Sequence, residues 1–239
     1  MDNQFKLTVF VEGLAEQIFV RQLLHAWFGY DENQVGFECL TLHRGQYGNV
    51  PYDIGSLKVS QCFYQIINTG NDNKVVQQVA DHSVSLSSKG FGIIGLRDMY
   101  SQAYLEHAKK RKCLAVHTDI NERFVASVNA HLDETLPHDV RANAHICFAI
   151  MEVEAWILAM KGYGENNVEE IFHPAERLKN EIPGYDKHGK QIESLVSTWQ
   201  KEDFMKLYSS GQCPSFNQFL QLLIPLQFLP NCLTSTEDR

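Results

Sequence analysis

The segment that most constrains the fold is residues 5–11, which is apolar and rich in β-branched and aromatic side chains and stops at Glu12-Gly13. Such a run predicts a buried strand. From Leu14 to Phe28 the apolar side chains recur at helical spacing, which predicts an amphipathic helix. A strand, a tight glycine turn and a helix in succession are typical of an α/β protein with a parallel sheet.

The rest of the chain continues this alternation. Strands are predicted over 37–42, 62–67, 91–96 and 145–150, and helices over 73–85, 101–112, 119–132 and 154–160. The Gly-rich, aromatic stretch 44–55 is interpreted as a loop. The fold class expected is therefore α/β, with a Rossmann-type, mostly parallel central sheet flanked by helices and a helical C-terminal extension.

The composition of the sequence changes near Gly162, after which the chain is more polar and contains several prolines. We expect an α/β catalytic domain over residues 1–162 and a helical extension over 163–239 packed on it. The last apolar helix is predicted from Ser215, taken as its N-cap, to about Leu223. The tail from about residue 234 is expected to be disordered.

The net charge and the cysteine content limit which partners and which cellular location the chain is expected to have. The formal net charge is −8, so the molecule as a whole repels nucleic acid, and a nucleic-acid partner requires a local basic patch, a divalent metal or a basic companion. The six cysteines include no CxxC pair, and the N-terminal apolar run is too short for a secretory or membrane-spanning segment. We expect a cytoplasmic protein with reduced thiols and no membrane association.

A first acidic constellation is Glu12-Gly13-Leu14-Ala15-Glu16. Glu12 ends a predicted strand, at the sheet edge where ligands of α/β proteins bind. Glu16 lies one helical turn later, so both carboxylates can point to the same place. Two carboxylates form a hard-oxygen site suited to Mg²⁺ or Mn²⁺. The alternative is that Glu12 caps the helix and Glu16 is a solvated surface residue.

A second acid, Asp98, follows the apolar strand predicted over residues 91–96. It is expected at the same sheet edge as Glu12, although an Asp in this place is also a common helix N-cap. Gly90, Gly92 and Gly95 formally match GxGxxG, but a dinucleotide fingerprint follows a strand and opens a helix. These glycines lie inside the strand pattern, so we do not expect a dinucleotide site.

The acidic motifs and their order resemble the Toprim family. Within that family the resemblance is to the small stand-alone proteins related to OLD nucleases that are found beside ATPases in bacterial defence loci. The resemblance covers roughly residues 5–225. The motifs that carry it are Glu12-Gly13-Leu14-Ala15-Glu16, the strand-end Asp98, Glu152-Val153-Glu154-Ala155-Trp156 and Ser215-Phe216.

This resemblance implies a Mg²⁺- or Mn²⁺-dependent endonuclease of DNA or RNA, acting as an effector of anti-phage defence. Glu12, Glu16 and Asp98 are the expected catalytic residues. Glu16 and Asp98 would hold the metal, which neutralises the scissile phosphate and activates water, and Glu12 would either bind the metal or act as general acid or base. The implied partners are a nucleic-acid substrate, an ABC- or AAA-type ATPase encoded nearby and, in an oligomer, further copies of the chain.

The sequence departs from the family at Tyr100. Toprim proteins usually carry Asp-x-Asp after this strand, whereas this chain has Asp98-Met99-Tyr100. Glu152 or Glu154 could supply the missing metal ligand. Otherwise the chain is a catalytically degenerate docking or regulatory subunit, or an α/β domain whose acids are caps and surface charges.

The only dense basic run is Lys109, Lys110, Arg111 and Lys112. We expect these side chains to contact a nucleic-acid backbone. The alternative is a solvated helix terminus whose cations complement the helix dipole.

Overall fold

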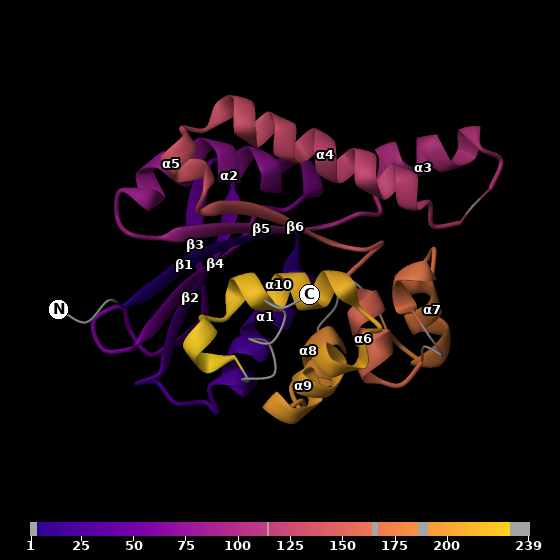
Figure 1. Cartoon of the computed structure of the whole chain (residues 1–239). Helices are drawn as coiled ribbons and strands as arrows, with labels where there is room; N and C mark the ends of the chain where they lie inside the picture. Colours follow the sequence, from indigo (N-terminus) through magenta and orange to yellow (C-terminus); the bar gives the residue numbers. More distant parts are fainter. Residues whose placement is uncertain (1–3, 114, 164–166, 186–190, 230–239) are drawn as a thin grey trace, which may run out of the picture.

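The computed structural model describes residues 4–113, 115–163, 167–185 and 191–229. Within them a six-stranded sheet runs through the middle of the molecule, with helices on both faces (Figure 1). The strands are β1 (Phe5–Val11), β2 (Val35–His43), β3 (Gln46–Ile54), β4 (Cys62–Asn68), β5 (Gly92–Asp98) and β6 (Ala144–Ala149). Their order is β3-β2-β4-β1-β5-β6, and all neighbours are parallel except the antiparallel pair β2–β3. The α/β class predicted from the sequence is confirmed.

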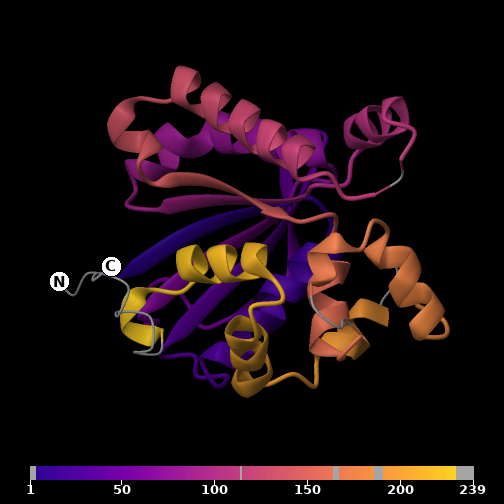
Figure 2. The ribbon, with the colours of Figure 1, turned by 45° about the vertical axis from the view of Figure 1, so that its right-hand side comes forward.

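Two groups of helices cover the sheet. The helices are α1 (Leu14–Trp27), α2 (Asp72–Ser87), α3 (Gln102–Lys110), α4 (Thr118–Thr135), α5 (His138–Arg141), α6 (Glu154–Met160), α7 (Pro174–Glu181), α8 (Gln191–Val196), α9 (Lys201–Ser210) and α10 (Pro214–Leu223), with short 3-10 turns η1 (Val168–Glu170) and η2 (Leu226–Phe228). Helices α2, α4 and α5 lie on one face, and α1 and α10 lie on the other with α6, α8 and α9 beyond them (Figures 1 and 2).

The C-terminal helices share a core with the sheet. One large apolar cluster joins strand residues such as Val9 and Ile94 to α1 and to side chains of α6, α9 and α10, including Trp156, Phe204 and Phe216. A smaller cluster fills the opposite face under α2, α4 and α5. The predicted short helices after Gly162 are present in the described residues, whereas the tail from about 234 lies outside them.

Two local predictions were wrong. Residues 44–55, interpreted as a loop, contain β3, which pairs with β2 at the edge of the sheet. Ser215 is not the N-cap of the last helix, because that helix begins with Pro214 and its N-cap is Cys213. Proline is favoured at the first helical position, since its missing N–H has no partner there in any case.

The chain leaves β1 and β5 in opposite directions. From β1 it passes through α1 to β2 on one side of the sheet, and from β5 it passes through α3, α4 and α5 to β6 on the other side. Neighbouring parallel strands whose connections diverge leave a crevice at their carboxyl ends, where α/β proteins bind ligands. Glu12 follows β1 and Asp98 ends β5, so both acids stand at this topological switch point.

Candidate metal centre

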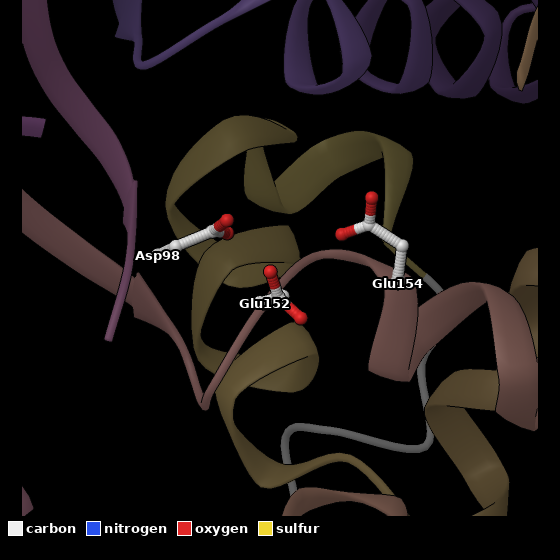
Figure 3. Close-up of side chains that lie close together, drawn as sticks. All are labelled: Asp98, Glu152 and Glu154. Carbon is white, nitrogen blue, oxygen red and sulfur yellow. The ribbon is translucent and has the colours of Figure 1, made fainter. Parts of the chain in front are cut away.

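Three carboxylates meet at the carboxyl edge of the sheet. One oxygen from each of Asp98, Glu152 and Glu154 lies within 4.8 Å of the other two, the only such group of metal-ligand side chains among the described residues. Figure 3 shows the three side chains turned toward one another from the end of β5, the segment after β6 and the start of α6. All three are buried, with exposed fractions of 1%, 6% and 0%.

The backbone at Met151 brings the two glutamates to Asp98. Met151 is buried and has a φ of 62°, a left-handed conformation that is uncommon for a residue with a side chain. Its carbonyl accepts a 2.7 Å hydrogen bond from the Tyr100 amide, so this turn is fastened to the segment after β5. Strained backbone of this kind is typical of functional sites, where the surrounding structure must hold it in place.

Each carboxylate of the cluster is also held by a hydrogen bond. Asp98 Oδ1 accepts from the Val153 amide at 3.0 Å, and Glu152 Oε2 accepts from the Ala175 amide in the first turn of α7 at 3.0 Å. Glu154 Oε1 accepts from the Tyr185 hydroxyl at 2.8 Å. Because these bonds anchor the side chains, the carboxylates keep their convergent arrangement.

Glu12 borders this group of three and is not one of its members. Its Oε2 accepts the backbone N–H of Asp98 at 3.2 Å, and the residue is partly exposed. It therefore does not cap α1, whose N-cap is Gly13 and has no side-chain hydrogen bond. Nor does Asp98 cap the next helix, because that position belongs to Ser101. Neither Glu12 nor Asp98 is therefore a helix cap, which was the alternative interpretation of both acids.

Glu16 is buried, with 2% of its surface exposed, so it is not the solvated residue of the alternative interpretation. Its Oε2 would lie 3.1 Å from a Cβ placed on Gly13. The absence of a side chain at Gly13 therefore lets the Glu16 carboxylate fold back over the turn that follows β1. Glu16, like Glu12, lies outside the group formed by Asp98, Glu152 and Glu154.

The neighbouring cation, Arg97, points away from the cluster. Successive residues of a strand face opposite sides of a sheet. Arg97 Nη2 accordingly pairs with Asp72 Oδ2 of α2 at 3.2 Å, and the guanidinium lies 5.3 Å from the centre of the Phe148 ring.

The Glu-x-Glu-x-Trp and Ser-Phe motifs are in direct contact through Trp156, a contact that the spacing of the motifs in the sequence did not predict. The Trp156 indole N–H donates to Ser215 Oγ at 3.0 Å, and its ring lies 5.4 Å from that of Phe216. Ser215 in turn donates through both its N–H and its hydroxyl to Glu169 Oε1, at 2.8 and 2.5 Å. This chain of bonds ties α6, which carries Glu154, to α10 and η1.

Burial raises the pKa of Glu169 above its ordinary value of 4.5, and the two bonds from Ser215 oppose that rise. Glu169 was not singled out from the sequence. The reason is that nothing in its local pattern, Asn-Val-Glu-Glu, distinguishes it from a surface acid.

The four basic residues predicted to contact nucleic acid lie at the end of α3 and just beyond it, and all are exposed. Arg111 forms an ion pair with Asp119 of α4. The other three are Lys109, Lys110 and Lys112.

Tyr100, in the place of the expected second Asp, is partly buried, and its ring centre lies 5.7 Å from that of Phe172 and 5.0 Å from that of His173.

The fold and the site define an α/β protein with a buried acidic cluster that could bind a metal ion at the carboxyl edge of its sheet. Carboxylate oxygens are the ligands that hard divalent cations prefer. Comparisons with protein-family models, with curated proteins and with solved structures gave no match to this chain. Among the helices of the described residues, none has the length and hydrophobicity needed to cross a membrane.

Proposed function

We propose that this chain is a Toprim-like, Mg²⁺- or Mn²⁺-dependent nuclease that hydrolyses phosphodiester bonds in DNA or RNA. The observation that carries the proposal is the convergence of Asp98, Glu152 and Glu154 within 4.8 Å at the switch point of a mostly parallel sheet. Three acids from two strand ends match the way in which α/β enzymes assemble sites at this edge.

In this proposal the chain supplies the metal ligands from two separate segments. Asp98 comes from the end of β5, and Glu152 and Glu154 come from the turn after β6, so Glu152 and Glu154 take the place of the carboxylate missing at Tyr100. A bound divalent cation would neutralise charge on the scissile phosphate and activate water.

Glu12 is the candidate general acid or base. The residue is partly exposed and its carboxylate accepts the backbone N–H of Asp98, so it would exchange a proton with a substrate at the edge of the cluster. Glu16, folded over Gly13, would position the Glu12 turn rather than contact the metal.

Substrate binding must overcome the net charge of −8. The exposed run Lys109, Lys110, Arg111 and Lys112 offers a local basic contact for a nucleic-acid backbone. An ATPase encoded beside this chain, as in the defence loci of Toprim-like relatives, would supply further targeting and control.

The decisive experiment compares cleavage of DNA and RNA by the wild-type chain and by Asp98→Asn and Glu12→Gln, with Mg²⁺ or Mn²⁺ and with or without the neighbouring ATPase. Loss of a general acid or base lowers such rates by about 100- to 10,000-fold, and we expect a loss of this size for Glu12→Gln. Asp98→Asn removes a metal ligand and should also abolish most of the cleavage. Glu134→Gln is the matched control, because Glu134 is an exposed acid of α4. Equal cleavage by all four proteins would mean that the activity belongs to a contaminant or another site.

A second candidate is a docking or regulatory subunit with the same fold. The observation that favours it is Tyr100, whose ring packs against Phe172 and His173 where family members carry a metal-binding Asp. Intact DNA and RNA under every condition above, together with stable binding of the ATPase, would support this candidate over the nuclease.

A further inference from the structure

A separate cavity lies on the other face of the sheet from the acidic cluster. Its volume is about 530 Å³, and its walls come from the start of α2, the end of β5, α3 and α4. Cavities of roughly 300–1,000 Å³ are the size that holds small ligands. The residues that decide its chemistry are Asp72, Arg97, Gln102, His107, Arg123 and Phe124.

The most informative wall residue is Arg97. Its side chain is 8% exposed, and Nη2 pairs with Asp72, which also lines the cavity. Its Nε is buried and has no hydrogen-bond partner among the described residues. A buried donor without a partner is unfavourable by about 1–3 kcal/mol, so Asp72 alone does not satisfy the Arg97 guanidinium that lines the cavity.

Two helices present their N-termini to the same cavity. Asp72 and Asn73 open α2, where the Asp72 carboxylate accepts the Asn73 amide at 2.8 Å, and Gln102 and Ala103 open α3. Amides of a first helical turn have no carbonyl partner within the helix, and the helix dipole favours anions there. In α3 the Ser101 cap accepts the amide of Tyr104, so the amides of Gln102 and Ala103 remain for a ligand.

The remaining walls supply a second cation and an apolar surface. Arg123 is exposed. Its Nη2 pairs with the Asp119 carboxylate at 3.7 Å and its Nε donates to the Asp119 carbonyl at 3.2 Å, so the guanidinium would turn from Asp119 to meet an anion in the cavity. Ala103, Phe124 and Val128 form the apolar part. An anion site beside an aromatic wall suits a molecule with both a phosphate and a flat ring.

We propose that this cavity binds a free mononucleotide, whose phosphate lies between Arg97, Arg123 and the first turn of α3 and whose base packs against Phe124. Arg97 and Asp98 are consecutive in β5, so the ligand and the acidic cluster would lie on opposite sides of the same strand end. The site does not depend on the proposed nuclease activity.

The test is isothermal titration calorimetry of the full-length chain with AMP, GMP, adenosine and inorganic phosphate in the presence of EDTA. EDTA removes divalent cations, so the outcome is independent of the metal centre. We expect AMP or GMP to bind more tightly than adenosine or phosphate alone. Arg123→Gln and Gln102→Glu should each weaken nucleotide binding about tenfold, because one removes a cation and the other adds an anion at the cavity.

Both variants should fold, because Arg123 and Gln102 are exposed and glutamate is favoured in a first helical turn. Arg177→Gln on α7 and Gln221→Glu on α10 make the same charge changes elsewhere and should bind as the wild type does. Absence of nucleotide binding, equal affinity for AMP and phosphate, or unchanged affinity in both cavity variants would overturn the assignment. Tighter binding of a 5′-phosphorylated oligonucleotide than of AMP would also overturn it, in favour of a strand end.

Discussion

The Ser215 hydroxyl bridges two buried groups, the Trp156 indole N–H and the Glu169 carboxylate. We predict that Ser215→Ala lowers the free energy of unfolding by about 1–3 kcal/mol, since both groups are desolvated and lose a hydrogen bond. Urea denaturation followed by tryptophan fluorescence measures this change. Ser209→Ala, at an exposed position of α9, should leave the stability unchanged. A Ser215→Ala variant as stable as Ser209→Ala would contradict the role of Ser215.

Glu169 makes stability depend on pH. Burial raises its pKa in the folded chain above the ordinary value of 4.5, so the folded state binds the proton more tightly than the unfolded state. Its contribution is therefore fully present below about pH 4.5 and is lost as the pH rises through the folded pKa.

Glu169→Gln keeps an oxygen that can accept from Ser215 and removes the titration. We predict that the variant gains stability relative to the wild type between acidic and neutral pH. Urea denaturation of both proteins across this range gives the difference in the free energy of unfolding. A difference that is constant with pH would show that Glu169 does not titrate in this range.

At the residue scale, the sequence identified important residues better than it predicted the contacts that they make. In the sequence, only the family resemblance linked Trp156 to Ser215 and Phe216. In the structure, the Trp156 side chain contacts both residues. The N-cap predicted for Ser215 was wrong because Pro214 already occupies the first helical position. Glu169 carried no signal, since its burial depends on helices that are distant in sequence.

At the scale of elements, Gly95 sets the distance between β5 and α2. A Cβ on Gly95 would lie 2.5 Å from Ile146 Cδ1 and 2.8 Å from Val75 Cγ1. We predict that Gly95→Ala lowers the free energy of unfolding by about 1–3 kcal/mol through overpacking. Thermal unfolding by calorimetry tests this, with Gly48→Ala in β3 as the control, because a Cβ there meets nothing closer than 3.9 Å. Equal stability of the two variants would contradict the close packing.

Periodicity predicted most elements, because five strands are apolar and the helices of the sheet region are amphipathic. It missed β3, whose residues are mostly exposed and include Gly48 and Pro51. These residues normally indicate turns, and they are tolerated here because β3 is an edge strand that pairs on one side only. A strand stabilised by its partner β2 rather than by its own burial leaves little trace in its hydrophobic pattern.

For the whole molecule, the sequence placed five candidate metal ligands at one edge of the sheet, including Glu152 and Glu154. It did not predict that these two and Asp98 would form a group that excludes Glu12 and Glu16. Glu12 and Asp98 follow neighbouring strands, and the backbone N–H of Asp98 donates to the Glu12 carboxylate at 3.2 Å. Glu152 and Glu154 complete the cluster because Met151 adopts a left-handed conformation. All three carboxylates are buried, and the Glu152 carboxylate accepts the Ala175 amide of α7.

This arrangement links metal binding to the stability of the whole chain. A ligand that binds only the folded state stabilises it by about 2.7 kcal/mol when its concentration is 100 times its dissociation constant. The acids come from β5, from the turn after β6 and from α6, so the unfolded chain cannot hold them together. Saturating Mn²⁺ or Mg²⁺ should therefore raise the melting temperature of the wild type by about 5–10 °C.

Asp98→Asn should lose most of this rise, because an amide is a weaker ligand than a carboxylate, while Glu134→Gln should keep it. Calorimetric melting curves with metal, and again after addition of EDTA, separate a reversible metal effect from a general effect of salt. A rise of the same size in Asp98→Asn would place the metal elsewhere. No rise in the wild type would show that the cluster does not bind these cations, whatever the outcome of the cleavage experiment.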